Sequence, residues 1–272
     1  MSSYSFRVAD LIDSTETYEV FAIRYSERLT STDEAYFRNG VYGEGSRPFT
    51  MAYFFWVIRG ATGTFLFDSG FSSDAATHRS RTFLIEPLHA LKEMSLTPED
   101  VDALYLSHLH FDHTGHLDQF PRAEVFVESQ EFDFWTQGCG RKKMLAASSE
   151  STDLLALEAM HRRGRARFLE GTSVVQPGIV SIHVGGHTPG QHILSVNTVN
   201  GPVVLASDAL HYYDELYLDR PFALFTDVED MYRGYELLRQ LESAGVKVVA
   251  GHDMAVIERY GVEDSAPFLT RL

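Results

Sequence analysis

The sequence contains a single cysteine, Cys139, among 272 residues. One cysteine cannot form an internal disulfide, and it cannot build a metal site that needs several thiolates. Long apolar stretches are missing as well, because no segment reaches the roughly 18 uninterrupted apolar residues of a membrane-spanning helix. Residues 1–13 lack the basic region and apolar run of a secretory signal, and they lack the arginine-rich pattern of a transit peptide. We therefore expect a cytoplasmic protein without a membrane span.

Basic residues are scarce, with 23 Lys and Arg against 38 Asp and Glu, and the formal net charge is −15. A surface of that sign repels the phosphate backbone of nucleic acids. The main basic cluster is short and has no interleaved aromatic residues, and it consists of Arg162, Arg163, Arg165 and Arg167. We expect this cluster to be a solvated helix end or loop. The sequence therefore argues against a nucleic-acid partner, and it is compatible with a homo-oligomer that acts on a small molecule.

Short apolar runs of strand length dominate both halves of the chain, with helical segments between them. Residues Met51–Ile58 and Thr64–Phe67, joined by a glycine-containing turn, predict a hairpin that is buried on both faces. Further strands are predicted at 101–106, 123–127, 174–175, 179–184, 193–199, 203–206 and 246–250, and helices at 75–94, 129–135 and 228–243. This order predicts a layered α/β domain with two sheets. We expect a single domain over residues 1–272, with a helical insertion at 136–170.

The segment that follows the strand at 101–106 is rich in residues that bind metals. It reads His108-Leu109-His110-Phe111-Asp112-His113. In an extended segment, residues two apart point the same way, so His108 and His110 can present their imidazoles to one metal ion. Asp112 and His113 follow where the chain must turn, and they can face a neighbouring ion. Three histidines and a carboxylate are costly to bury unless something coordinates them, so the cluster predicts metal binding.

Three other predicted strands also end in a residue type that binds metals. His187 follows the strand at 179–184, Asp208 follows 203–206, and His252 follows 246–250. A single histidine after a strand is more often a cap or a solvent-facing residue. Strand ends of this kind meet at one edge of an α/β fold, so together they predict one shared site. His116 and His192 lie close to these residues, and each is either a supporting hydrogen-bond partner or an ordinary structural residue.

The six-residue motif at 108–113 resembles the HxHxDH signature of the metallo-β-lactamase superfamily. His187, Asp208 and His252 occur in the family's order, and the resemblance extends from about Phe49 to Asp253. The turn Asp68-Ser69-Gly70 also matches a family turn that supports the site. The resemblance implies an αβ/βα sandwich of two mixed β-sheets flanked by helices, with the metal ions at one edge.

The resemblance also implies a dinuclear centre in which Asp208 bridges two divalent ions. His108, His110 and His187 would be the ligands of the first ion. The ligands of the second ion would be Asp112, His113 and His252. Zinc is the default for such a site, although imidazole with carboxylate also suits iron, manganese or cobalt. A hydroxide that bridges the ions would be the nucleophile. Asp112 would orient this hydroxide and later pass a proton to the leaving group.

Within the superfamily, the chain is most similar to the N-acyl homoserine lactonase-like branch. The signals are the motif at 108–113, Gly-His-Thr-Pro-Gly around His187, Gly-His-Asp around His252, and the segment at 220–225. They imply hydrolysis of a lactone ring, with quorum-quenching action on N-acyl homoserine lactones as the specific form. That branch usually has a tyrosine three residues after the bridging aspartate, where it polarises the substrate carbonyl. Here the position holds His211, so His211 itself, Tyr212 or Tyr213 is left as the donor.

Other functions fit the same ligand set. A thioesterase, a β-lactamase and an organophosphate hydrolase share the implied architecture. From a different class, a redox-active iron protein or a non-catalytic metal-containing sensor could use these residues. Diiron flavoprotein relatives normally need a flavin domain, for which 272 residues leave no room. Three aromatic residues just past Asp208 are candidates for the pocket wall, namely Tyr217, Phe222 and Phe225.

Overall fold

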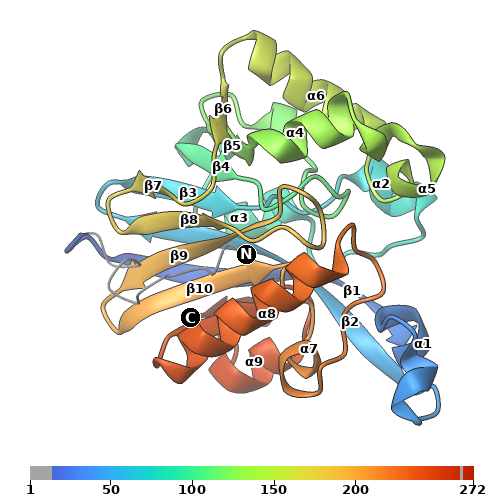
Figure 1. Ribbon diagram of the computed structural model, residues 1–272. Helices are drawn as coiled ribbons and strands as arrows, with labels where there is room; N and C mark the ends of the chain where they lie inside the picture. The colour runs from blue at the N-terminus through green and yellow to red at the C-terminus, as the bar shows by residue number, and fades with distance from the viewer. Residues whose placement is uncertain (1–13, 264–265) are drawn as a thin grey trace.

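A computed structural model describes residues 14–263 and 266–272 of the protein. Two β-sheets pack face to face, and helices lie on their outer sides (Figure 1). The seven-stranded sheet has the strand order β12-β1-β2-β3-β4-β5-β6, and the five-stranded sheet has the order β11-β10-β9-β8-β7. Each sheet contains both parallel and antiparallel pairs. The predicted αβ/βα sandwich with two mixed sheets is therefore confirmed.

The elements have the following bounds. The strands of the seven-stranded sheet are β1 (Tyr18–Ser31), β2 (Pro48–Gly60), β3 (Gly63–Phe67), β4 (Ala103–Tyr105), β5 (Glu124–Glu128), β6 (Ala166–Leu169) and β12 (Leu269–Arg271). Those of the five-stranded sheet are β7 (Ser173–Gln176), β8 (Ile179–His183), β9 (His192–Thr198), β10 (Gly201–Ser207) and β11 (Lys247–Ala250). The α-helices are α1 (Thr32–Ala35), α2 (Ser73–His78), α3 (Pro87–Glu93), α4 (Ser129–Thr136), α5 (Lys143–Ala146), α6 (Ser151–Arg162), α7 (Tyr213–Tyr217), α8 (Val228–Ser243) and α9 (Ala255–Tyr260). Short 3-10 turns are η2 (Asn39–Tyr42), η3 (Pro98–Asp100), η4 (Leu117–Gln119) and η5 (Cys139–Arg141).

Strand β2 is buried on both of its faces, which explains its unbroken apolar sequence. Phe54 and Trp56 point into the core between the two sheets. Phe55 and Val57 point to the opposite side, into the core between the seven-stranded sheet and its helices. Strands β2 and β3 form the predicted hairpin, with Gly60 paired to Gly63. The hairpin therefore forms the centre around which both cores are built.

Some elements differ from the sequence-based expectation. The helix predicted over 75–94 is two helices, because α2 ends at His78, just before Ser80 with its left-handed φ of +54°, and α3 begins only at Pro87. No strand was predicted before Met51, yet β1 runs for 14 residues and pairs with β2 along its whole length. Charged residues such as Glu19 and Arg24 interrupt its apolar pattern, which concealed the strand.

The segment 136–170 contains helices α5 and α6 and ends in β6, a strand that the sequence analysis did not expect. β6 pairs in parallel with β5 at the edge of the sheet, and Arg167 on its exposed side forms an ion pair with Glu124. The basic cluster thus lies at the end of α6 and on an edge strand. That 136–170 is an insertion stays a prediction. In the part of the chain that the structure describes, no helix has the length and apolar character needed to cross a membrane.

Candidate metal centre

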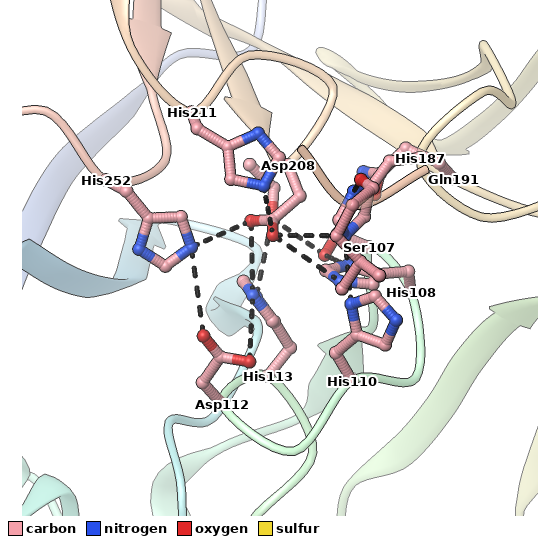
Figure 2. A network of polar contacts seen from close by, with 12 residues as sticks. Ser107, His108, His110, Asp112, His113, His187, Gln191, Asp208, His211 and His252 are labelled. Carbon is pink, nitrogen blue, oxygen red and sulfur yellow. Dashed lines mark hydrogen bonds and ion pairs between the residues drawn. The ribbon is translucent and has the colours of Figure 1, made fainter. Parts of the chain in front are cut away.

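All seven residues predicted as metal ligands lie together, buried, beyond the ends of β4, β8, β10 and β11 (Figure 2). Their ligand atoms form two groups, each with its atoms within 4.8 Å of one another. The first group is His108, His110, His187 and Asp208, and the second is Asp112, His113 and His252. A third group overlaps these two and joins Asp208 and His252 to His211. The structure therefore brings together strand ends that are far apart in the sequence.

Asp208 occupies the middle of the cluster, and its two oxygens face different groups (Figure 2). Oδ1 lies 3.2 Å from Nε2 of His113 and 3.0 Å from Nε2 of His252. Oδ2 lies 3.2 Å from Nε2 of His187 and 3.7 Å from Nε2 of His108. A carboxylate whose oxygens are divided in this way has the geometry of a bridging ligand between two ions.

The imidazoles are oriented as metal ligands are. Nδ1 of His187 donates to the Leu224 carbonyl at 2.8 Å, and Nδ1 of His252 donates to the Ala52 carbonyl at 2.7 Å. These bonds place the hydrogen on Nδ1 and leave the lone pair of Nε2 directed at the centre. Nε2 of His108 and Nε2 of His113 are buried without a hydrogen-bond partner among the described residues. Buried nitrogens of this kind fit a metal ion, so the donor set is suited to two divalent cations.

The protonation states of most ligands also suit metal binding. Burial and the neighbouring histidines lower the pKa of His108 and His110 well below the usual range, so both rings are neutral. Burial raises the pKa of Asp208, but the surrounding histidines lower it by more, so its carboxylate is ionised. Burial lowers the pKa of His113, whereas Asp208, Asp68 and Asp112 raise it by more, so a proton competes with metal there. Neutral imidazole and ionised carboxylate are the forms that coordinate.

Asp68, in the turn at the end of β3, holds the cluster from behind. Its fully buried carboxylate accepts hydrogen bonds from the Ser107 N–H and hydroxyl at 2.8 Å each, and from the Ser207 hydroxyl at 2.9 Å. It also accepts Nδ1–H of His113 at 2.7 Å. A carboxylate that orients a ligand histidine raises the basicity of that ligand. The family turn at 68–70 therefore has the supporting position that the resemblance implied.

Glu131 in α4 is a structural link that the sequence analysis missed. Its buried carboxylate accepts the Leu109 N–H and the Gly190 N–H, each at 2.9 Å, and Nε1–H of Trp135 at 2.6 Å. Leu109 lies between two ligand histidines, and Gly190 lies in the His187 loop, so one side chain ties two ligand loops together. A Cβ at Gly190 would lie only 2.4 Å from Cβ of Glu131, so only glycine allows this approach. A glutamate within a helix has no sequence signal that distinguishes this role from a solvent-exposed one.

Gly186 lets the His187 loop lie against the start of α8. Its φ is +86°, and a Cβ there would come within 2.5 Å of the Met231 backbone nitrogen. The Gly186 carbonyl accepts N–H groups of Thr226 at 2.9 Å and Asp227 at 3.0 Å. The loop geometry therefore requires glycine, and it fixes the position of His187 relative to the segment at 220–227.

The three candidate donors at 211–213 have different surroundings in the structure. His211 is fully buried, with Nε2 2.9 Å from Oδ2 of Asp208 and its ring stacked on Phe222 at a centroid distance of 3.6 Å. Burial lowers the pKa of His211, but Asp208 and Glu215 raise it by more, to about 9. Only His211 of the three thus reaches the cluster.

The two tyrosines that follow His211 have other surroundings. The Tyr213 hydroxyl donates to the Val248 carbonyl at 3.0 Å, so it is engaged on β11. Tyr212 packs edge-to-face against Tyr36 and Phe49, and it lines a neighbouring cavity of about 460 Å³. The structure therefore does not bring Tyr212 into the metal cluster, and kinetics of a Tyr212 variant test the catalytic part that the sequence analysis gave it.

A pocket of about 140 Å³ opens over the cluster. It is lined by the ligands His110, Asp112, His187 and Asp208, and by Arg28, Met51, Tyr53, Arg81, Phe111, Ser148, Phe222 and Leu224. Of the three predicted wall residues, Phe222 lines this pocket. Tyr217 lines the neighbouring cavity, and Phe225 packs against Phe37 and the core between the sheets.

His116 and His192 do not point at the centre. Nε2 of His116 lies 3.1 Å from the Phe71 carbonyl and 3.2 Å from Glu86. The ring of His192 packs against Phe67 in the core between the sheets, and its backbone N–H donates to the Ser107 carbonyl at 3.0 Å. His192 thus supports the segment that carries His108 through its backbone N–H, not through its ring.

The family model described as "Metallo-beta-lactamase superfamily" matches residues 51–252, a range that contains every residue of the cluster. The chain belongs to the metallo-beta-lactamase superfamily. An N-acyl homoserine lactonase of Bacillus sp is 29% identical over 172 residues, which are 61% of this chain and 62% of the relative. The match thus covers less than two thirds of the relative's length.

Solved structures of lactonases share the fold. A quorum-quenching N-acyl homoserine lactone lactonase superposes with a TM-score of 0.74 at 20% identity, covering 90% of this chain and 95% of that one. A dizinc quorum-quenching lactonase, AidC, superposes with a TM-score of 0.69 at 17% identity, covering 88% and 92%. At these identities the superpositions establish the sandwich fold.

Proposed function

We propose that the protein is a metal-dependent hydrolase that opens a lactone ring. The observation that carries the proposal is Asp208, whose two oxygens face separate groups of buried ligand atoms at the base of a pocket. The N-acyl homoserine lactonases among its relatives support a cyclic ester as the substrate. N-acyl homoserine lactones are the first members of that class to test.

Two divalent ions held by these seven residues would lower the pKa of a water molecule to near neutrality and polarise the ester carbonyl. His108, His110 and His187 would hold one ion. Asp112, His113 and His252 would hold the other, and Asp208 would be shared. We propose zinc, because histidine-rich sites favour it and because a structural neighbour is a dizinc lactonase.

Two residues of the chain would move or donate protons. The Asp112 carboxylate lines the pocket, where one of its oxygens can take the proton of the attacking oxygen nucleophile and deliver it to the leaving alkoxide. His211, whose Nε2 lies 2.9 Å from Oδ2 of Asp208, would donate Nε2–H to the substrate carbonyl oxygen. The stacked Phe222 ring keeps His211 in place and excludes water from that side.

Replacing His211 with alanine is expected to lower kcat for a lactone by about 10²- to 10³-fold, because one donor to the developing oxyanion is lost. Metal content should stay at two ions. His211→Tyr should recover part of the loss by restoring a donor. Tyr212→Phe, in which the rival hydroxyl is removed, should keep wild-type kcat. Steady-state kinetics decide between the two donors, and a large loss in Tyr212→Phe with none in His211→Ala would contradict the assignment.

The function itself is tested with metal-free protein that is reloaded with zinc and given a panel of esters. The panel contains N-acyl homoserine lactones, simple γ-lactones, thioesters, β-lactams and phosphotriesters. We expect the highest kcat/KM for a lactone, and we expect His108→Ala to lose metal and turnover together. If no lactone is hydrolysed, or if thioesters or phosphotriesters react far faster, the lactonase proposal fails.

A further inference from the structure

Two arginines line the pocket above the metal cluster, although most of the lining side chains that are not metal ligands are apolar or aromatic. Arg28 comes from β1, and Arg81 comes from the segment between α2 and α3. Both side chains are half-buried. Two cations in one small pocket are unexpected in a chain whose net charge is −15, so their partners need to be accounted for.

These two arginines form few ion pairs with carboxylates of the protein. Nε–H of Arg81 donates to the Tyr53 hydroxyl at 3.2 Å, and Nη1–H donates to the Arg79 carbonyl at 2.8 Å. Within the described ranges 14–263 and 266–272, Arg81 makes no ion pair. Among the carboxylates of these ranges, Arg28 pairs only with Glu34, at 3.5 Å, and the Glu34 side chain is 61% exposed. In the same part of the chain, Nη2 of each arginine has no hydrogen-bond partner.

The nearby Arg79 shows what a structural arginine looks like in this fold. Its guanidinium pairs with Glu150 at 2.5 Å and donates to the carbonyls of Ala147 and Ser149 at 2.9 Å and 3.1 Å. It also lies over the Phe111 ring, 4.0 Å from the centroid. Every part of that side chain is thus engaged, in contrast to Arg28 and Arg81.

Both guanidinium groups contact strand β2 in the pocket wall, and Arg81 does so beside the second ligand group. The Tyr53 hydroxyl accepts from Arg81, and the Tyr53 ring packs edge-to-face on His252 at a centroid distance of 5.3 Å. Nε–H of Arg28 points to Sδ of Met51 at 3.5 Å, and Met51 lies on the same strand, β2, as Tyr53. The unpartnered nitrogens therefore belong to side chains that share a wall with the metal ligands.

The charge of the metal cluster does not require these arginines as counter-charges. Two divalent ions would bring four positive charges. The carboxylates of Asp68, Asp112 and Asp208, together with the hydroxide proposed as the nucleophile, would balance these charges without the arginines. Unpaired guanidinium groups recognise carboxylates through paired, charge-assisted hydrogen bonds.

We infer that the substrate is a lactone that carries a carboxylate group besides its ester, and that Arg28 and Arg81 bind this carboxylate. The inference rests on the proposed lactonase function and narrows its substrate class. A neutral lactone lacks the group that these arginines recognise, so it would bind more weakly.

The test compares two γ-lactones with the same ring, 5-oxotetrahydrofuran-2-carboxylate and its neutral primary amide, on zinc-loaded protein. We expect the KM of the wild type to be about tenfold lower for the carboxylate, with similar kcat values. Arg28→Met and Arg81→Met should each raise that KM about tenfold or more and change the values for the amide by less than about twofold. Raising NaCl to about 0.5 M should narrow the difference between the two lactones.

The matched control is Arg59→Met, because Arg59 lies near the opposite end of β2 and pairs with Glu19. This variant should change neither KM nor kcat for either lactone. If Arg81→Met fails to fold after losing its bond to Tyr53, Arg28→Met decides. Equal KM values for the two lactones, or equal effects of Arg28→Met on both, would overturn the inference and leave the lactonase function intact. If neither lactone nor any other lactone is hydrolysed, the proposed function fails and the inference fails with it.

Discussion

Replacing Asp208 with alanine is expected to remove at least one metal ion and to lower kcat/KM for a lactone about a thousandfold or more, a barrier increase of roughly 4 kcal/mol. The reason is the position of its two oxygens. Oδ1 lies 3.0 Å from Nε2 of His252, and Oδ2 lies 3.2 Å from Nε2 of His187, so a single side chain serves both ligand groups. Two neighbouring dications repel each other, and the shared carboxylate offsets that repulsion.

Metal content after dialysis and steady-state kinetics on a lactone check this prediction together. Asp208→Asn should also fail to hold two ions, because the amide keeps the shape of the side chain and loses the charge. Asp253→Asn is the matched control. The Asp253 carboxylate follows a ligand histidine in the sequence, but it accepts the N–H groups of Tyr213 and Ala255, each at 2.9 Å. A variant Asp208→Ala that retained two ions and wild-type turnover would show that Asp208 is not a shared ligand.

Replacing Glu131 with alanine is expected to lower the free energy of unfolding by about 3–5 kcal/mol, because buried donors are left without an acceptor. Three donors depend on this carboxylate, namely the N–H groups of Leu109 and Gly190 and Nε1–H of Trp135. Each unsatisfied buried donor costs about 1–3 kcal/mol, and water entering the vacated space would recover part of the sum. The two ligand loops should also lose their relative position, which lowers metal affinity.

Urea denaturation of the metal-free protein measures this effect without the contribution of bound metal. Glu131→Gln should fall between wild type and alanine, because its amide keeps one acceptor oxygen and turns an NH₂ group toward a donor. Asp133→Ala serves as the control on the same helix, since Asp133 is exposed and its carboxylate accepts a hydrogen bond from the Gln137 side-chain amide at 3.2 Å. It should change the free energy of unfolding by less than about 0.5 kcal/mol. If Glu131→Ala proved as stable as Asp133→Ala, the linking role of Glu131 would be wrong.

The sequence alone was enough to predict the features that depend on local patterns. The unbroken apolar run at 51–58 predicted a strand buried on both faces, and the helical pattern at 228–243 predicted α8 with its observed ends. The motif at 108–113 and the strand ends at 187, 208 and 252 predicted which residues cluster. These features can be predicted from the sequence because strand alternation, helix periodicity and the position after a strand all depend on residues that are close in the sequence.

Only the tertiary structure decided how distant residues act on that cluster. Glu131 and Arg81 have the same local pattern whether they face water or the site, and their roles follow from contacts with segments 22 to 59 positions away, such as Leu109, Gly190 and Tyr53. The three candidates at 211–213 are consecutive, so spacing could not separate them. His211 reaches Asp208, whereas the Tyr213 hydroxyl is engaged by Val248, because the chain direction after β10 and the packing of α7 orient each side chain differently.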